Sequence, residues 1–271
     1  MVRPAARREI ACVVQKEFHL SERRVCRLVK IHRTTKRYEP KSNDDSDVLQ
    51  KIHEVIKENP RYGAPQVHRM LRRQGMGINH KRTTRIYSDA GLQLKHRPPK
   101  RKRRRPISEL PRPAERMEKW SLDFVHDNLS NGRSIRTLTI IDEHSRESPM
   151  IEVDTSLSSL RVIQVLNRLK HTVGLPTEIG VDSGSEFTSH EFQNWAKQNG
   201  IGLGYCQPGK KNENAFIESF NARFRDECLN MHWFTTVDEA REIIEDWRNH
   251  YNTKRPHGSL GGLTPFEFAN N

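Results

Sequence analysis

The sequence predicts an all-α region followed by an α/β domain in which helices flank a mixed five-stranded sheet. Three observations lead to this prediction. The 271 residues carry a formal net charge of +13, but residues 1–118 hold 31 Lys and Arg against 13 Asp and Glu, and residues 119–271 hold 16 against 21. Apolar residues of the basic part recur at helical spacing. In the acidic part, short apolar runs alternate with helical patterns, which is typical of a sheet covered by helices.

Two groups of three short helices are predicted in the basic part. The first group covers residues 5–18, a helix that carries Val25, and residues 33–38; the second covers 48–58, a helix beginning near Pro65, and 80–86. Proline suits the first turn of a helix, and Asn79 suits an N-cap. Such groups are typical of helix-turn-helix DNA-binding units and also of plain structural bundles. The net charge of +18 on residues 1–118 favours binding to a polyanion such as DNA.

A basic, proline-rich linker is predicted between the helices and the α/β domain. Residues 95–105 contain eight Lys and Arg in eleven positions, and prolines lie at 98, 99, 106, 111 and 113. Such a segment stays extended and follows phosphates by charge, although a solvated linker is the plainer interpretation. The predicted DNA contacts of this half are Lys81, Arg82, Arg85, Lys100, Arg101, Lys102, Arg103, Arg104 and Arg105.

The α/β domain is predicted to contain five strands and four helices. The strands are expected at 120–125, 134–141, 150–153, 178–181 and 201–205, and the helices at 158–172, 189–199, 214–228 and 237–251. We therefore divide the chain into helical segments 1–42 and 43–94, a linker 95–114, and a domain 115–271 that ends in a helical tail. The four tryptophans of this domain, including Trp233, are expected in its core.

Several classes of protein are not expected. No run of 18 apolar residues predicts a membrane span, and the first residues have no apolar core of a secretory signal. The four cysteines are scattered without a C-x-x-C pair, so neither a disulfide scaffold nor a zinc site is expected.

Three carboxylates occupy unusual positions. Asp123 interrupts an apolar strand, Asp182 ends the strand I-G-V-D before a loop of turn-forming residues, and Glu218 lies opposite the apolar stripe of its helix. The same helix face carries Asn214, Asn221 and Arg225. Gathered acids repel one another unless a cation neutralises them, and oxygen ligands suit Mg²⁺ or Mn²⁺. Spacing alone does not decide whether the three converge; each singly is also explained as a surface charge.

The surrounding motifs resemble a known family. They are W-S-L-D-F-V at 120–125, T-I-I-D-E-H-S-R at 139–146, D-S-G-S-E-F at 182–187, N-A-F-I-E-S-F-N at 214–221, R-D-E-C-L-N at 225–230, Y-N-T-K-R-P-H at 251–257 and Y-G-A-P at 62–65. Together they resemble the second-frame transposases of IS-three family insertion sequences. One departure is Ser183, where the family usually has Asn. His257 belongs to the family pattern, and the sequence leaves open whether it serves a structural turn or contacts DNA.

The resemblance implies a ribonuclease-H-like core in which Asp123, Asp182 and Glu218 form a DDE triad. In that fold the first and fourth strands are neighbours, which would bring Asp123 beside Asp182, and Glu218 would reach in from its helix. It implies two Mg²⁺ or Mn²⁺ ions held by these residues, cleavage of double-stranded DNA at the element ends, and strand transfer. Lys211 is expected to contact phosphate, as are Asn214, Asn221 and Arg225. It also implies a homo-oligomer on DNA, the upstream-frame product of the element as fusion or partner, and a bacterial cytoplasmic, nucleoid-associated location.

Two alternatives remain open from the sequence. A nuclease of the same fold would hydrolyse DNA without joining it, and a transposon-derived repressor would bind DNA without catalysis. The intact Asp123, Asp182 and Glu218 count against the repressor, because a protein that only binds DNA has no use for clustered acids.

Overall fold

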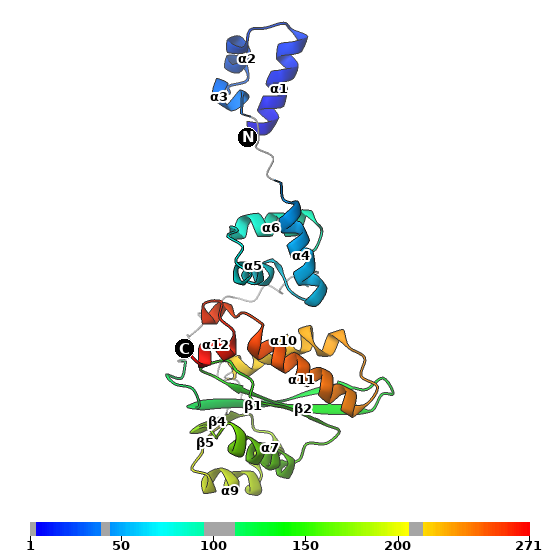
Figure 1. The fold of residues 1–271 in the computed structure, drawn as a ribbon, viewed down its shortest axis with the longest axis vertical. Helices are drawn as coiled ribbons and strands as arrows, with labels where there is room; N and C mark the ends of the chain where they lie inside the picture. The colour runs from blue at the N-terminus through cyan, green and yellow to red at the C-terminus, as the bar shows by residue number, and fades with distance from the viewer. Residues whose placement is uncertain (1–3, 39–43, 95–111, 206–213) are drawn as a thin grey trace. The chain divides into compact units, whose positions relative to one another are not determined.

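The protein is described by a computed structural model that covers residues 4–38, 44–94, 112–205 and 214–271 (Figure 1). The chain divides into two compact units, Met1–Asp47 and Val48–Asn271. The first unit contains α1 (Pro4–Glu17), α2 (Glu22–Leu28) and α3 (Arg33–Lys36). Its fully or almost fully buried apolar side chains are Ala11, Val25 and Cys26. The interior of this small helical unit is therefore slight.

The second unit begins with three helices, α4 (Ser46–Glu58, whose first residues precede the division), α5 (Ala64–Arg73) and α6 (His80–Asp89). Local signals explain their starts. Pro65 lies in the first turn of α5, and the Asn79 side chain accepts a hydrogen bond from Lys81 N at 2.9 Å as the N-cap of α6. The three helices share an apolar core that comprises Val48, Ile52, Val55, Tyr62, Val67, Leu71, Ile78, Ile86 and Tyr87.

The predicted five-stranded mixed sheet is confirmed. It comprises β1 (Lys119–Asn128), β2 (Ser134–Asp142), β3 (Ile151–Asp154), β4 (Glu178–Val181) and β5 (Gly202–Tyr205), in the order β3-β2-β1-β4-β5. β1 pairs with β2 in antiparallel fashion and with β4 in parallel fashion. The β2–β3 pair is antiparallel and the β4–β5 pair is parallel. β1 is thus the central strand of the sheet, with β2 on one side and β4 on the other.

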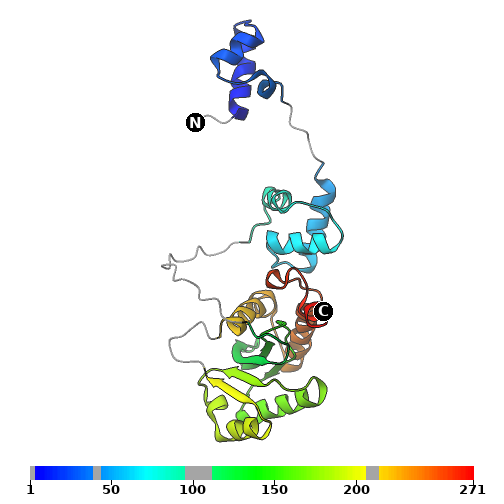
Figure 2. The same ribbon diagram turned by 90° about the vertical axis from the view of Figure 1, so that its left-hand side faces the viewer.

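Helices cover both faces of the sheet (Figures 1 and 2). One face packs against α7 (Ser159–Thr172), α8 (Ser185–Thr188) and α9 (His190–Gln198), and the other against α10 (Ala215–Glu227) and α11 (Val237–Thr253). Alternation along β1 serves both cores, since Leu122 joins the first and Val125 the second. The short helices α8, η1 (Leu229–Met231), η2 (Gly258–Leu260) and α12 (Pro265–Ala269) were not predicted, because three to five residues show no helical period.

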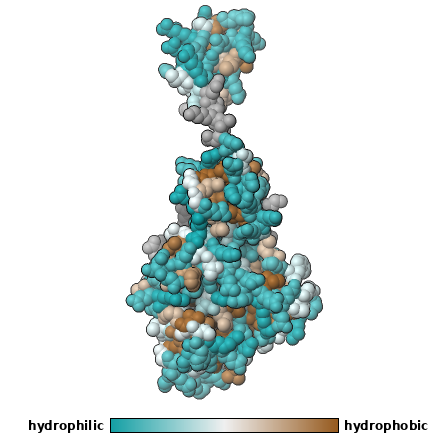
Figure 3. All heavy atoms as spheres, in the orientation of Figure 1, coloured by the Kyte–Doolittle hydropathy of each residue, from teal (hydrophilic) through white to brown (hydrophobic). Residues whose placement is uncertain are grey.

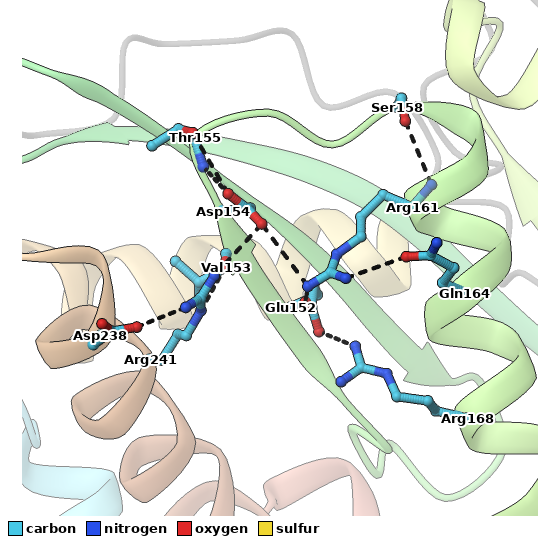
Figure 4. A network of polar contacts seen from close by, with 10 residues as sticks. All are labelled: Glu152, Val153, Asp154, Thr155, Ser158, Arg161, Gln164, Arg168, Asp238 and Arg241. Atoms are coloured by element: carbon cyan, nitrogen blue, oxygen red, sulfur yellow. Dashed lines mark hydrogen bonds and ion pairs between the residues drawn. The ribbon is translucent and has the colours of Figure 1, made fainter.

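The edge strand β3 is covered by arginine side chains (Figure 4). Arg161 donates to Glu152 Oε1 at 2.7 Å, and Arg168 binds the other oxygen of the same carboxylate. From α11, Arg241 Nε donates to the carbonyl oxygen of Val153 at 3.0 Å. These contacts fasten α7 and α11 to the edge of the sheet, and the one from Arg241 occupies a backbone carbonyl of the edge strand.

The expectation that all four tryptophans lie in the core is wrong for one of them. Trp120 and Trp195 are buried and Trp247 packs against the core, but Trp233 is 87 % exposed. Its neighbour Phe234 is buried, and Phe234 O accepts a hydrogen bond from Ser130 N at 2.8 Å. Successive side chains of an extended segment point in opposite directions, so the core position taken by Phe234 turns Trp233 outward.

The face drawn in Figure 3 is mainly hydrophilic, with hydrophobic side chains scattered over it. Among the helices of the described residues, none combines the length and the apolar composition needed to cross a membrane.

Candidate active site

Parallel pairing of β1 with β4 brings two of the predicted carboxylates together. Ser121 of β1 lies opposite Gly180 of β4. Two positions further along are Asp123, within β1, and Asp182, directly after the last residue of β4. Neighbouring strands lie about 5 Å apart, so the continued register places Asp182 beside Asp123. The strand order joins these residues, which lie 59 positions apart in the chain, and it agrees with the neighbouring first and fourth strands that the family resemblance implied.

Asp123 is partly buried and tightly held. Its Oδ1 accepts a hydrogen bond from Phe124 N at 2.8 Å, and its Oδ2 accepts one from Asn221 Nδ2 at 2.7 Å. Burial raises the pKa of Asp123 above its usual 3.8, and the negative charges of Asp182 and Glu218 act in the same direction, against the lowering effect of the two hydrogen bonds. The three carboxylates therefore belong to one electrostatic site.

Helix α10 delivers Glu218 to this site because the helix is amphipathic. Ile217, Phe220 and Phe224 are completely buried on its sheet-facing side. Glu218 lies on the other side and is exposed, one turn from the start of the helix. The predicted apolar stripe is confirmed, and it orients the carboxylate through packing that is remote from the carboxylate itself.

Asn221 braces Asp123 rather than facing solvent. While its amide nitrogen donates to Asp123, its Oδ1 accepts a hydrogen bond from Thr139 Oγ1 at 2.9 Å. Thr139 is the cross-strand partner of Asp123 in the β1–β2 ladder. The sequence predicted a DNA contact for Asn221 and no role for Thr139. Nothing local in the sequence reveals this triangle, because it depends on the register of β1 with β2.

A glycine and an ion pair shape the turn after β4. Gly184 N donates to Asp182 Oδ1 at 2.9 Å, and a Cβ atom on residue 184 would lie 2.9 Å from the same oxygen. In the following helix α8, Glu186 pairs with Arg136 at 2.6 Å. Ser183, which departs from the family pattern, is exposed beside Asp182. Only a residue without a side chain permits this close approach to the carboxylate.

The other predicted residues of α10 have distinct surroundings. Arg225 is exposed, and its terminal nitrogens lie 3.4 Å from the carbonyl oxygen of His126. Asn214 is the N-cap residue of α10, and its buried Oδ1 has no hydrogen-bond partner among the described residues. Asn214 thus lies at the beginning of the helix that carries Glu218, and Arg225 lies near its end.

The basic residues predicted to contact DNA are only partly within the described chain. Lys81 and Arg85 are exposed on α6, the last helix of the α4–α6 group, and Arg82 is partly exposed beside them. Arg85 also pairs with Asp89 at 3.5 Å. The predicted contacts Lys100, Arg101, Lys102, Arg103, Arg104, Arg105 and Lys211 lie outside the described residues.

The donor chemistry of the site fits a hard divalent cation. Three carboxylates in mutual electrostatic range are oxygen donors of the kind that Mg²⁺ and Mn²⁺ prefer. The pKa of Asp123 is raised first by burial and then by the charges of Asp182 and Glu218, and a cation would relieve the repulsion among these charges. In the described part of the chain, however, no three His, Cys, Asp or Glu side chains are gathered closely enough to share one ion. The residues fit such an ion by the chemistry of their oxygen donors.

Comparison with known protein families agrees with this architecture. Residues 113–211 and 199–265 each match an integrase core domain, and residues 42–102 match an HTH-like domain. The fold also resembles a chain of the simian T-cell lymphotropic virus intasome in complex with PP2A regulatory subunit B56 gamma. That match has a TM-score of 0.55 at 15 % identity and covers 81 % of this chain and 74 % of the other. The core is thus ribonuclease-H-like.

Curated relatives come from bacterial insertion elements. The 31.7 kDa protein of IS407 from Burkholderia multivorans is 43 % identical over 260 residues, which cover 94 % of this chain and 93 % of the relative. The 39.2 kDa protein of IS476 from Xanthomonas euvesicatoria is 40 % identical and covers 99 % and 78 %. The Escherichia coli transposase InsD of IS2 is 28 % identical and covers 83 % and 79 %. The chain therefore belongs to the integrase-core transposases of insertion elements, as a second-frame protein of the IS-three family, and acts on DNA as a DDE-type enzyme of transposition.

Proposed function

We propose that this transposase cleaves the ends of its insertion element and joins them to target DNA, with Asp123, Asp182 and Glu218 as the catalytic carboxylates. The observation that supports this most strongly is the register of β1 with β4, which sets Asp182 beside Asp123. The raised pKa of Asp123, caused by burial and by the charges of Asp182 and Glu218, supports a shared site.

The same three carboxylates would hold two Mg²⁺ or Mn²⁺ ions. When bound, such ions activate the attacking oxygen and stabilise the leaving oxygen of a phosphodiester. The chain supplies the positioning. Asn221 and Phe124 N hold the Asp123 carboxylate, and Gly184 N holds that of Asp182. The exposed position of Glu218 leaves its side of the site open to DNA. Water attacks in cleavage, and the freed 3′-OH attacks in joining.

Recognition of DNA is proposed to fall mainly to the basic half. The helical segments 1–42 and 43–94 and the linker 95–114 would attract phosphates, with Lys81, Arg82 and Arg85 on the exposed side of α6. The domain 115–271 would supply the chemistry. We further propose a homo-oligomer on DNA, a fusion or complex with the upstream-frame product, and action at the bacterial nucleoid in the cytoplasm, where the element's DNA lies.

The test uses labelled element ends, both intact and pre-cut, incubated with the full chain and Mg²⁺, with and without the upstream-frame product. Asp123→Asn, Asp182→Asn and Glu218→Gln should each abolish nicking and joining without lowering the melting temperature by more than a few degrees. Glu242→Gln, a change of the same kind at an exposed position of α11, serves as the control and should remain active.

The outcomes separate the alternatives. Joined products from pre-cut ends support a transposase, and nicks without joined products favour a nuclease. Binding without either product in both arms favours a repressor. A triad variant that turns over at the wild-type rate removes that residue from the site.

A further inference from the structure

A buried ion pair lies where helix α10 ends. Arg255 is 8 % exposed, and its guanidinium donates two hydrogen bonds to Glu227, at 2.8 Å and 2.6 Å. Glu227 is the last residue of α10, the helix that carries Glu218. A bidentate pair of this kind has one well-defined geometry. The end of the catalytic helix is therefore tied to the segment that follows α11.

The α4–α6 helices contact this same segment. The Arg255 guanidinium lies 5.7 Å from the centre of the Tyr62 ring, and Tyr62, between α4 and α5, is almost completely buried. Gln66 Nε2 of α5 donates a hydrogen bond to the carbonyl oxygen of Pro256 at 2.7 Å, and this contact is buried. Two successive residues of the R-P-H motif thus face the helical group, and one of them also holds α10.

At the rim of this contact, a second bidentate pair joins the same two parts. Arg73 of α5 pairs with Glu267 of α12 at 2.7 Å and 2.6 Å. In addition, Arg61 lies 3.5 Å from Asp226 of α10. A cavity of about 470 Å³ lies beside these contacts, between residues 57–62 and the helices α10 and α11. The polar contacts around this cavity join the α4–α6 helices to the core.

His257 gives the receiving segment its shape. It is 5 % exposed, and its ring packs edge-on against Tyr251 with ring centres 4.8 Å apart. The backbone N–H of His257 donates to Leu263 O at 2.9 Å, and its backbone carbonyl oxygen accepts hydrogen bonds from the N–H groups of Leu260 and Gly262. Burial, together with nearby arginines, lowers the pKa of His257 to about 2, so the ring is neutral. The backbone of His257 thus closes the turn, while its buried ring packs on Tyr251 and its Nε2 has no hydrogen-bond partner among the described residues.

We propose that Arg255, Pro256 and His257 form a clasp that seats the α4–α6 helices against the end of α10, so that DNA held by those helices reaches the carboxylates in one register. The clasp acts through α10, in which Glu227 lies nine residues after Glu218, about 14 Å along the helix axis. Arg255 is thus a positioning residue. The inference rests on the proposed function for its effect on cleavage, but the seating itself is a property of the fold.

The test replaces Gln66 by Glu in the full chain. Glu still accepts the hydrogen bond that Arg69 donates to Gln66 Oε1 at 2.9 Å, but it no longer donates to Pro256 O and sets a charge against that carbonyl. Gln66→Met removes the donor to Pro256 O and the acceptor of the Arg69 hydrogen bond, without adding a charge. Gln50→Glu adds the same charge on α4, where Gln50 contacts Glu54 at the surface, and is the matched control.

Two measurements follow each variant. The first is energy transfer between dyes at exposed positions Gln93, just after α6, and Glu242, on α11. The ratio of seated to released molecules should fall about tenfold or more in Gln66→Glu, because the carboxylate loses the buried hydrogen bond to Pro256 O and repels that carbonyl oxygen. The ratio should fall less in Gln66→Met, which adds no charge. The second is the position of nicks on labelled element ends. In Gln66→Glu the nicks should spread over neighbouring phosphodiesters, and this spread should be larger than any loss of total nicking. Gln50→Glu should match the wild type in both.

Each contrary result has one meaning. Unchanged energy transfer in Gln66→Glu overturns the clasp. Reduced energy transfer with sharply placed nicks overturns its role in register, and a uniform loss of nicking at the original position indicates destabilisation alone. Absence of nicking by the wild type, with the expected energy transfer, counts against the proposed function while leaving the clasp supported.

Discussion

Replacing Asn221 by Leu tests whether the bracing of Asp123 matters for catalysis. The change keeps the approximate volume of the side chain and removes the 2.7 Å hydrogen bond from Asn221 Nδ2 to Asp123 Oδ2. A hydrogen bond to a charged group contributes about 1.5–3 kcal/mol. If the full amount is lost at the transition state, the rate falls by about 10- to 150-fold, at 1.36 kcal/mol per factor of ten.

The same change predicts a shift in the pH dependence. The hydrogen bond from Asn221 lowers the pKa of Asp123 against the raising effects of burial and of neighbouring charges. Removing it raises that pKa further. The ionised carboxylate is the form that binds a cation, so activity is lost as the pH falls through the pKa of Asp123. We therefore expect the acidic limb of the nicking rate to move to higher pH in Asn221→Leu.

The assay is the single-turnover nicking rate on labelled element ends, measured from neutral pH down through the acidic range. Asn194→Leu, at an exposed position of α9 where the amide contacts His190, is the control and should behave as the wild type. Thr139→Val removes the hydroxyl that holds Asn221 and should give a weaker form of the same defect. A wild-type rate and pH profile in Asn221→Leu would refute the bracing role.

Three further outcomes are expected. Lys81→Ala should weaken binding to DNA of any sequence and reduce the slope of log affinity against log salt by about 1; an unchanged slope would exclude a phosphate contact. Gly184→Ala should slow nicking about tenfold or more, because its Cβ displaces the carboxylate that follows β4 and costs a charge-assisted hydrogen bond, whereas Gly77→Ala, with open space around its Cβ, should be silent. The hydrogen bond from Arg73 lowers the pKa of Glu267 from 4.5 to about 2. The contribution of this ion pair to the free energy of unfolding is therefore present above pH 4.5 and is lost as the pH falls towards 2. Urea unfolding should show Arg73→Ala less stable by no more than about 1 kcal/mol at pH 7, with the difference shrinking at pH 3; a difference independent of pH would contradict this.

Much of the catalytic domain could be predicted from local patterns. The stripe of Ile217, Phe220 and Phe224 repeats at helical spacing, and all three are buried, so both the helix and the outward direction of Glu218 follow from the sequence. Strand β1 was predicted to end near Val125 but continues to Asn128, because pairing with β2 extends to Ser134 and compensates for the polar residues at its end. Trp233 was misplaced because hydrophobicity alone does not say which of two adjacent aromatic residues faces the core.

The amino-acid sequence by itself determined which residues could perform the chemistry and which segments form helices and strands, since capping, periodicity and charge act over a few neighbouring residues. That Asp182 lies beside Asp123 was implied by the family resemblance and not by any local pattern. Tertiary structure alone decided that Asn221 and Thr139 close a triangle around Asp123, and that Pro256 receives Gln66 from 190 residues away. These contacts depend on strand order, register and the seating of helices. Such features are selected by the free energy of the whole packed chain, and no local segment carries that information.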